Sequence, residues 1–114
     1  MRCLLIPVLT LIPVLALSDG MPASEDATVG KAVYSQTCVA CHGVNGKGTI
    51  PGVTDFTGKD SPLRKSDAKL VNNISEGFQS PGSFMAMPAK GGNPTLTEAD
   101  VRAVLAFLRA EFGT

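Results

Sequence analysis

Several residue types are scarce in this chain of 114 residues, and each shortage excludes a class of protein. There is no tryptophan, only one histidine, and only three cysteines. Ten basic side chains balance ten acidic ones and no basic run occurs, which excludes a strongly basic nucleic-acid-binding surface. Apolar residues make up 44% of the chain, too many for a disordered protein, and the length favours a single domain.

The chain also lacks an apolar run of the about 20 residues that a membrane-spanning helix needs. The longest one, residues 3–17, follows a single basic residue and is interrupted by two prolines. Small residues at Ala16 and Ser18 suit a signal peptidase, so we predict a cleaved secretory signal peptide over residues 1–18. A lipoprotein anchor needs a cysteine just after the apolar run, whereas Cys3 stands at its beginning, so we exclude that anchor.

Export predicts a periplasmic protein with no stable membrane insertion after cleavage of the signal. The polar residues 19–26 are expected to form a flexible segment, and residues 27–114 to form the folded domain. Only two cysteines, Cys38 and Cys41, remain after cleavage.

The periodicity of the folded domain is helical. Apolar residues at helical spacing predict helices over residues 28–41 and 66–76, the second with Ser66 as N-cap and Gly77 as C-cap. The clearest helix follows Thr97, which forms a capping-box-like pair with Asp100.

Two loops rich in glycine and proline, residues 43–58 and 79–94, separate these helices, and no alternating strand pattern occurs. We therefore expect an all-α fold of short helices and long loops. Loops this long in a small domain are usually functional.

The chemistry lies in residues 38–42, which read C-V-A-C-H and match C-x-x-C-H, the haem-attachment signature. Two thiols three residues apart on a helical turn can bond the two haem vinyl groups, and His42 then reaches the iron. C-x-x-C alone could form a redox dithiol or disulfide, but a thioredoxin-like site needs a βαβ setting, which the pattern lacks. A zinc site would need further cysteines or histidines.

Methionine is the natural second ligand to the iron, because no other histidine exists. Met21 lies in the expected flexible start, whereas Met85 and Met87 lie in the loop before the last helix. We favour Met87, since Pro88 holds it in an extended conformation. Packing of both methionines in the core is the alternative reading.

The order of several short motifs along the chain resembles that of a class I c-type cytochrome of the small, soluble, monohaem bacterial type. The resemblance covers residues 26–111 and rests on these segments: G-K-A-V-Y at 30–34, C-V-A-C-H-G at 38–43, G-T-I-P-G at 48–52, M-P-A-K-G-G-N at 87–93, and the last helix.

The resemblance implies one covalent haem c, with His42 and Met87 as axial ligands and the Pro51 carbonyl bonded to His42. It also implies that the first and last helices cross at Gly30. Gly30 and Tyr34 would then meet Val104 and Phe107. The absence of tryptophan leaves the haem propionates unassigned, with Arg64 as the best candidate partner.

Two bound ligands would close the iron to substrate, so the expected function is one-electron transfer rather than enzymatic catalysis. Methionine ligation raises the potential, and burial under Phe56, Phe78 and Phe84 would act in the same direction. Expected partners of the monomer are a cytochrome reductase, a dehydrogenase or a terminal oxidase, and no nucleic acid. A haem peroxidase, or a haem subunit or sensor of a larger redox complex, remains the alternative. Four lysines, at positions 47, 59, 65 and 90, are read as solvated surface residues.

Overall fold

Seven short helical segments make up the described structure, a computed structural model that covers residues 23–113. In chain order they are α1 (Ala23–Val33), the π-helical turn η1 (Tyr34–Cys38), α2 (Val39–His42), the 3-10 turn η2 (Pro62–Arg64), α3 (Asp67–Glu76), the 3-10 turn η3 (Ala89–Gly92) and α4 (Glu98–Phe112). Within these residues the β-structure is limited to one isolated bridge between Phe78 and Met87. The predicted all-α class is confirmed.

The first helix differs from its prediction at both ends. It begins at Ala23 rather than at Thr28, and so takes in residues 23–26 of the segment expected to be flexible. Glu25 and Asp26 lie in its first turn, where negative charge stabilises the helix dipole. At its other end the α-helix gives way to a π-helical turn before α2 begins. The predicted signal peptide over residues 1–18 lies outside the described residues.

The other two helices have the predicted caps. The Ser66 hydroxyl accepts a hydrogen bond from the amide of Lys69, and α3 ends at Gly77, whose φ is +86°. Thr97 and Asp100 form a complete capping box at the start of α4. The Ser66 and Thr97 caps satisfy amide groups that would otherwise lack a partner at the start of each helix.

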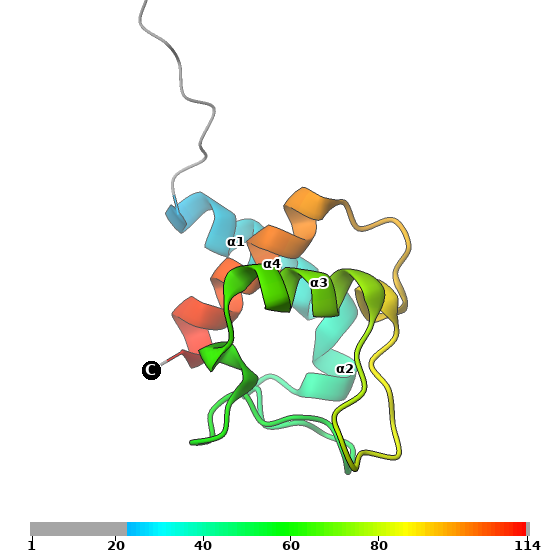
Figure 1. The fold of residues 1–114 in the computed structure, drawn as a ribbon. Helices are drawn as coiled ribbons and strands as arrows, with labels where there is room; N and C mark the ends of the chain where they lie inside the picture. The colour runs from blue at the N-terminus through cyan, green and yellow to red at the C-terminus, as the bar shows by residue number, and fades with distance from the viewer. Residues whose placement is uncertain (1–22, 114) are drawn as a thin grey trace, which may run out of the picture.

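Helices α1 and α4 cross, as Figure 1 shows, and Gly30 of α1 lies at the contact between them. A Cβ added at Gly30 would lie 2.9 Å from the Cβ of Phe107, and closer still to the backbone carbonyl of Ala103. The Tyr34 and Phe107 rings pack beside this crossing, with their centroids 5.2 Å apart. The predicted crossing and the Phe107 contact are confirmed, and the Ala103 backbone is the nearest neighbour of Gly30.

We expect Gly30→Ala to destabilise the protein, although in an exposed helix alanine is more stable than glycine by about 1 kcal/mol. The added Cβ collides with backbone rather than with a movable side chain. Gly30→Val should cost on the order of 3 kcal/mol, at the upper end of overpacking. Chemical denaturation measures both values. Gly58→Val is the control, because only Asp55 approaches that position, at 3.9 Å. A Gly30→Ala variant as stable as the parent would contradict this crossing.

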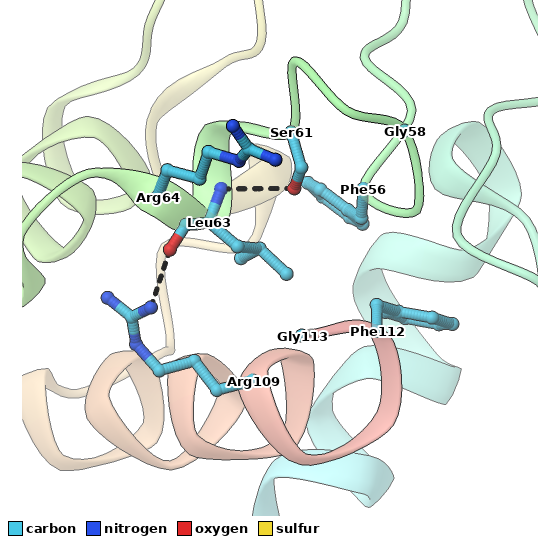
Figure 2. A pocket seen from close by; sticks show the side chains of 8 residues that line it. All are labelled: Phe56, Gly58, Ser61, Leu63, Arg64, Arg109, Phe112 and Gly113. Carbon is cyan, nitrogen blue, oxygen red and sulfur yellow. Dashed lines mark hydrogen bonds between the residues drawn. The ribbon is translucent and has the colours of Figure 1, made fainter.

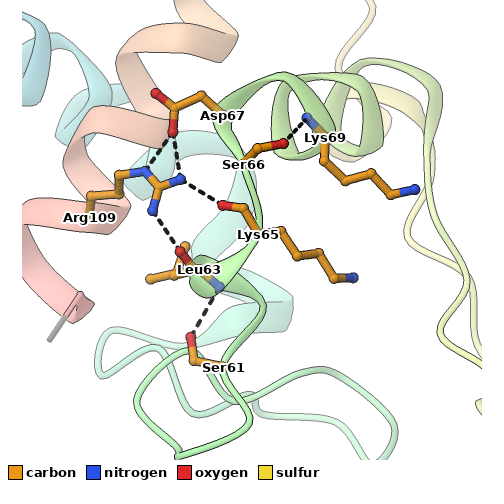
Figure 3. Close-up of polar contacts among 7 residues, drawn as sticks. All are labelled: Ser61, Leu63, Lys65, Ser66, Asp67, Lys69 and Arg109. Carbon is orange, nitrogen blue, oxygen red and sulfur yellow. Dashed lines mark hydrogen bonds and ion pairs between the residues drawn. The ribbon is translucent and has the colours of Figure 1, made fainter.

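Arg109 of α4 fastens the segment before α3, as Figure 3 shows. Its guanidinium donates to the backbone oxygens of Leu63 at 2.6 Å and Lys65 at 3.0 Å, and pairs with the Asp67 carboxylate at 2.5 Å. The ion pair alone contributes little to stability because Asp67 is exposed, but the carbonyl contacts fix the course of η2.

None of the helices within residues 23–113 is long and apolar enough to cross a membrane.

Candidate functional site

A cavity of about 610 Å³ lies among the helices and the two long loops. This volume lies in the usual range for cofactor sites. Helix α3 contributes Leu70 and Ile74, and α4 contributes Val104, Leu105 and Leu108. The predicted ligands that line it are Cys38, Cys41, His42, Met85 and Met87. The structure therefore brings the C-x-x-C-H segment and the methionine loop, which are far apart in the sequence, to one apolar space.

The π-helical turn places the two cysteines at the cavity wall. The amide of Val39 donates to the Tyr34 carbonyl across this turn, which widens the helix just before the C-x-x-C-H segment. Such turns occur frequently at functional sites. Cys38 is half-buried, Cys41 is exposed, and both are free thiols. Burial, helped by nearby Cys41, raises the pKa of the Cys38 thiol to about 11, so this thiol is uncharged at neutral pH.

His42 projects from the end of α2 and stacks on Phe56. The two ring centroids lie 4.7 Å apart, with 17° between the ring planes. Burial lowers the pKa of His42, while the nearby backbone of Thr54 partly opposes this. The imidazole is therefore neutral at pH 7, which is the form that binds a metal.

The Nδ1 atom of His42 is buried and lacks a hydrogen-bond partner among the described residues. No hydrogen bond joins this atom to the Pro51 carbonyl in the described residues, and the pairing of Pro51 with His42 stays a prediction. Pro51 itself is exposed and does not belong to the cavity wall. The structure places Pro51 in the loop that follows α2, one residue before Gly52, which does line the cavity.

Two hydroxyl groups hold the end of α2, and the sequence alone did not reveal these roles. Thr49 Oγ1 donates to the carbonyl oxygens of Ala40 at 2.7 Å and Cys41 at 3.2 Å. The buried Tyr34 hydroxyl donates to the Gly43 carbonyl at 2.5 Å. These bonds satisfy carbonyl groups at the helix end and fix the segment that carries His42. A threonine in a glycine-rich loop directly after a helix was the available signal.

Met87 is held more firmly than Met85, although both line the cavity. The Met87 amide donates to the Phe78 carbonyl at 2.8 Å, and the Phe78 amide donates back to Met87 at 3.0 Å. Gly77 permits this approach, since a Cβ there would lie 2.8 Å from the Met87 carbonyl oxygen. The amide of Met85 bonds only to the nearby Ser83 hydroxyl.

The three phenylalanines predicted to bury the site divide into two groups. Phe56 and Phe78 line the cavity, as expected. The prediction for Phe84 is wrong, because its side chain is 74% exposed and does not line the cavity. Its ring lies over Gly52 on the surface, where a Cβ would be 3.3 Å from Phe84 Cε1.

Cationic side chains lie at one side of the cavity. Lys59, Arg64 and Lys65 line it, and the Lys65 ammonium lies 4.7 Å from the centre of the Phe78 ring. A smaller cavity of about 330 Å³ adjoins this side, with Arg64 and Arg109 in its wall, as Figure 2 shows. Arg109 is bound to the η2 segment, whereas Arg64 makes no ion pair within the described residues. Arg64 is thus the guanidinium available to an acidic group in the larger cavity.

This donor set fits a haem rather than a lone metal ion. Within residues 23–113 no cluster of three or more histidine, cysteine or acidic side chains is placed to hold an ion, which excludes the zinc reading. Two free thiols, a neutral imidazole and two thioethers instead surround a large apolar cavity. Fold and site together define a c-type haem protein.

Comparisons with known proteins agree with the assignment to the c-type haem proteins. Residues 27–111 match the sequence model of the family described as cytochrome c, and the chain belongs to this family. It is 37% identical to cytochrome c-555 of Chlorobaculum thiosulfatiphilum over 83 residues, which cover 73% of this chain and 93% of that protein. It is 34% identical to cytochrome c-555 of Chlorobaculum tepidum, covering 81% of this chain and 82% of that protein.

A solved structure has the same fold. Cytochrome cL from the marine methylotrophic bacterium Methylophaga aminisulfidivorans superposes with a TM-score of 0.57, covering 82% of this chain and 55% of that one, at 21% sequence identity. The protein is therefore a class I monohaem c-type cytochrome, which binds haem c covalently and takes part in haem-based electron transfer.

Proposed function

We propose that this protein is a mobile one-electron carrier rather than an enzyme, with haem bonded to Cys38 and Cys41 and the iron held by His42 and Met87. The observation that carries the proposal is the meeting of all four side chains at one cavity. Bound haem would supply the reversible Fe(III)/Fe(II) couple.

The chain's own residues would set the properties of this couple. A neutral His42 and a methionine together leave no open position for substrate. Thioether ligation favours the ferrous state and raises the potential. The rings of Phe56 and Phe78 and the aliphatic wall from α3 and α4 exclude water, which disfavours the additional charge of the ferric state.

The orphaned Nδ1 of His42 supports a role for Pro51 within the same proposal. Ligand histidines commonly donate their second ring N–H to a carbonyl group. Thr49, two residues before Pro51, ties this loop to the end of α2, the helix that carries His42. We propose the Pro51 carbonyl as this acceptor in the haem-bound protein.

The location of the protein and its redox partners form the second part of the proposal. We propose that residues 1–18 direct the chain to the periplasm, where the monomer exchanges electrons with a reductase, a dehydrogenase or a terminal oxidase. Two relatives bear the names of a redox enzyme or of a subunit of one. The CcoP subunit of a cbb3-type cytochrome c oxidase from Rhodobacter capsulatus is 32% identical over 81% of this chain, which spans 32% of that subunit. Lupanine 17-hydroxylase [cytochrome c] of a Pseudomonas species is 34% identical over 76% of this chain, which spans 11% of that protein.

The test is ligand binding to the reduced protein, made in a host that attaches haem c. A carrier with both axial positions filled should bind carbon monoxide slowly or not at all, and should cycle between oxidised and reduced forms without loss. Rapid carbon monoxide binding together with peroxide turnover would indicate a peroxidase instead. Persistent co-purification with a larger redox complex would indicate a subunit or sensor.

A further inference from the structure

Two attachments hold the loop at and after Met87, in addition to the hydrogen bond from Ser83 to Gly52 earlier in the loop. The first is the bridge between Phe78 and Met87 described above. The second is a hydrogen bond at 3.3 Å, in which Asn93 Nδ2 donates to Thr37 Oγ1. Thr37 directly precedes Cys38 in the π-helical turn, so this bond ties the end of the methionine loop to the cysteine-bearing segment.

The orientation of the Asn93 amide is determined by its other partners. Its Oδ1 accepts from the Thr95 amide at 3.1 Å and from the Thr95 hydroxyl at 2.6 Å. Because the carbonyl oxygen is used there, the NH₂ group must face Thr37. The Asn93 backbone also bonds to Lys90 and Leu96, so this one residue joins η3 to the approach to α4.

The backbone between Met87 and Asn93 is shaped to make this contact. Lys90, Gly91 and Gly92 all have positive φ, at 54°, 63° and 85°. A left-handed conformation is uncommon for lysine and persists only where its surroundings hold it. The turn brings Gly91 against Thr37, where an added Cβ would lie 3.1 Å from Thr37 Cγ2. Thr37 and Gly91 both line the large cavity.

We propose that Thr37 and Asn93 form a clasp that keeps the Met87 loop closed and so limits how often the sixth iron position opens to small external ligands. This inference rests on the proposal that Met87 is an axial ligand. Without the clasp, the loop would keep its bridge to Phe78 but lose its second attachment, and the open state would become more populated. Both residues act through the position of Met87 and are positioning residues.

The experiment measures the limiting rate at which excess cyanide binds to the oxidised, haem-loaded protein, because loop opening precedes binding. Thr37→Val removes the hydroxyl but keeps the methyl group that contacts Gly91. We expect the rate to rise about five-fold, the factor that corresponds to one hydrogen bond of ordinary net strength. Thr37→Ser restores the hydroxyl and should return most of the way to the parental rate. Thr57→Val is the matched control, because that hydroxyl bonds to Asp55 instead.

A double-mutant cycle identifies the partner. Asn93→Asp keeps a carboxylate oxygen for Thr95 but removes the NH₂ donor; it should add no further increase in cyanide rate once Thr37→Val is present, whereas two additive effects would overturn the clasp. A Thr37→Val variant with the parental cyanide rate would also overturn it, even if its thermal midpoint falls. A parent that has no sulfur-to-iron charge-transfer band would instead refute Met87 ligation and the clasp with it. A parent that has the band, with unaltered rates in both variants, would refute the clasp alone.

Discussion

Replacing both cysteines, as Cys38→Ala/Cys41→Ala, should abolish covalent haem and remove most of the helical structure. The cavity they border occupies about 610 Å³ at the centre of a small domain, and its wall includes the apolar faces of α3 and α4. A domain of this size has little other core to offset the entropy lost on folding. Leu70 and Leu108 would face water or a collapsed space instead of a cofactor.

Mass spectrometry of the parent from a maturation-competent host should show one added haem that resists acid-acetone extraction. The double variant should show bare polypeptide, and circular dichroism should show a large loss of helix. Ser35→Ala is the control, since Ser35 is exposed in the same π-helical turn. Cooperative, native-like melting of the haem-free double variant would contradict the prediction. A parental mass with a Cys38–Cys41 disulfide and no haem would contradict attachment itself.

Local sequence signals sufficed for most of the helical framework. Ser66, Thr97 and Asp100 cap their helices through contacts within four residues, which a short window of sequence records. The crossing at Gly30 was predictable for a different reason. The resemblance to class I c-type cytochromes implied it, and a glycine inside a helix, where it costs stability, is consistent with the close approach of another element.

Contacts between distant segments were not visible in the sequence. The bridge between Phe78 and Met87 involves one residue pair, too short to produce an alternating pattern. The Thr37 to Asn93 bond joins residues 56 positions apart. The π-helical turn at Tyr34–Cys38 also escaped prediction, because the apolar spacing before it is that of an ordinary helix. Phe84 shows the complementary error, since an aromatic side chain is no guarantee of burial.

The choice between Met85 and Met87 as iron ligand gives the second large expected effect. Both side chains reach the cavity, so proximity alone does not decide between them. The backbone does: Met87 is held by two hydrogen bonds to Phe78 and precedes Pro88, whereas Met85 follows the exposed Phe84. A ligand on a fixed backbone loses less conformational entropy when it binds.

Met87→Leu should therefore abolish the sulfur-to-ferric-iron charge-transfer band, lower the potential and open the reduced iron to carbon monoxide. Leucine keeps the side-chain volume, and such a swap usually costs less than about 1.5 kcal/mol of stability, so the spectral loss would report ligation rather than packing. Met85→Leu is the matched control and should keep the band. The reverse pattern would assign the iron to Met85, and a band that survives in both variants would mean that either methionine can serve. Absence of the band in the parent would remove methionine ligation altogether and with it the argument for a closed iron.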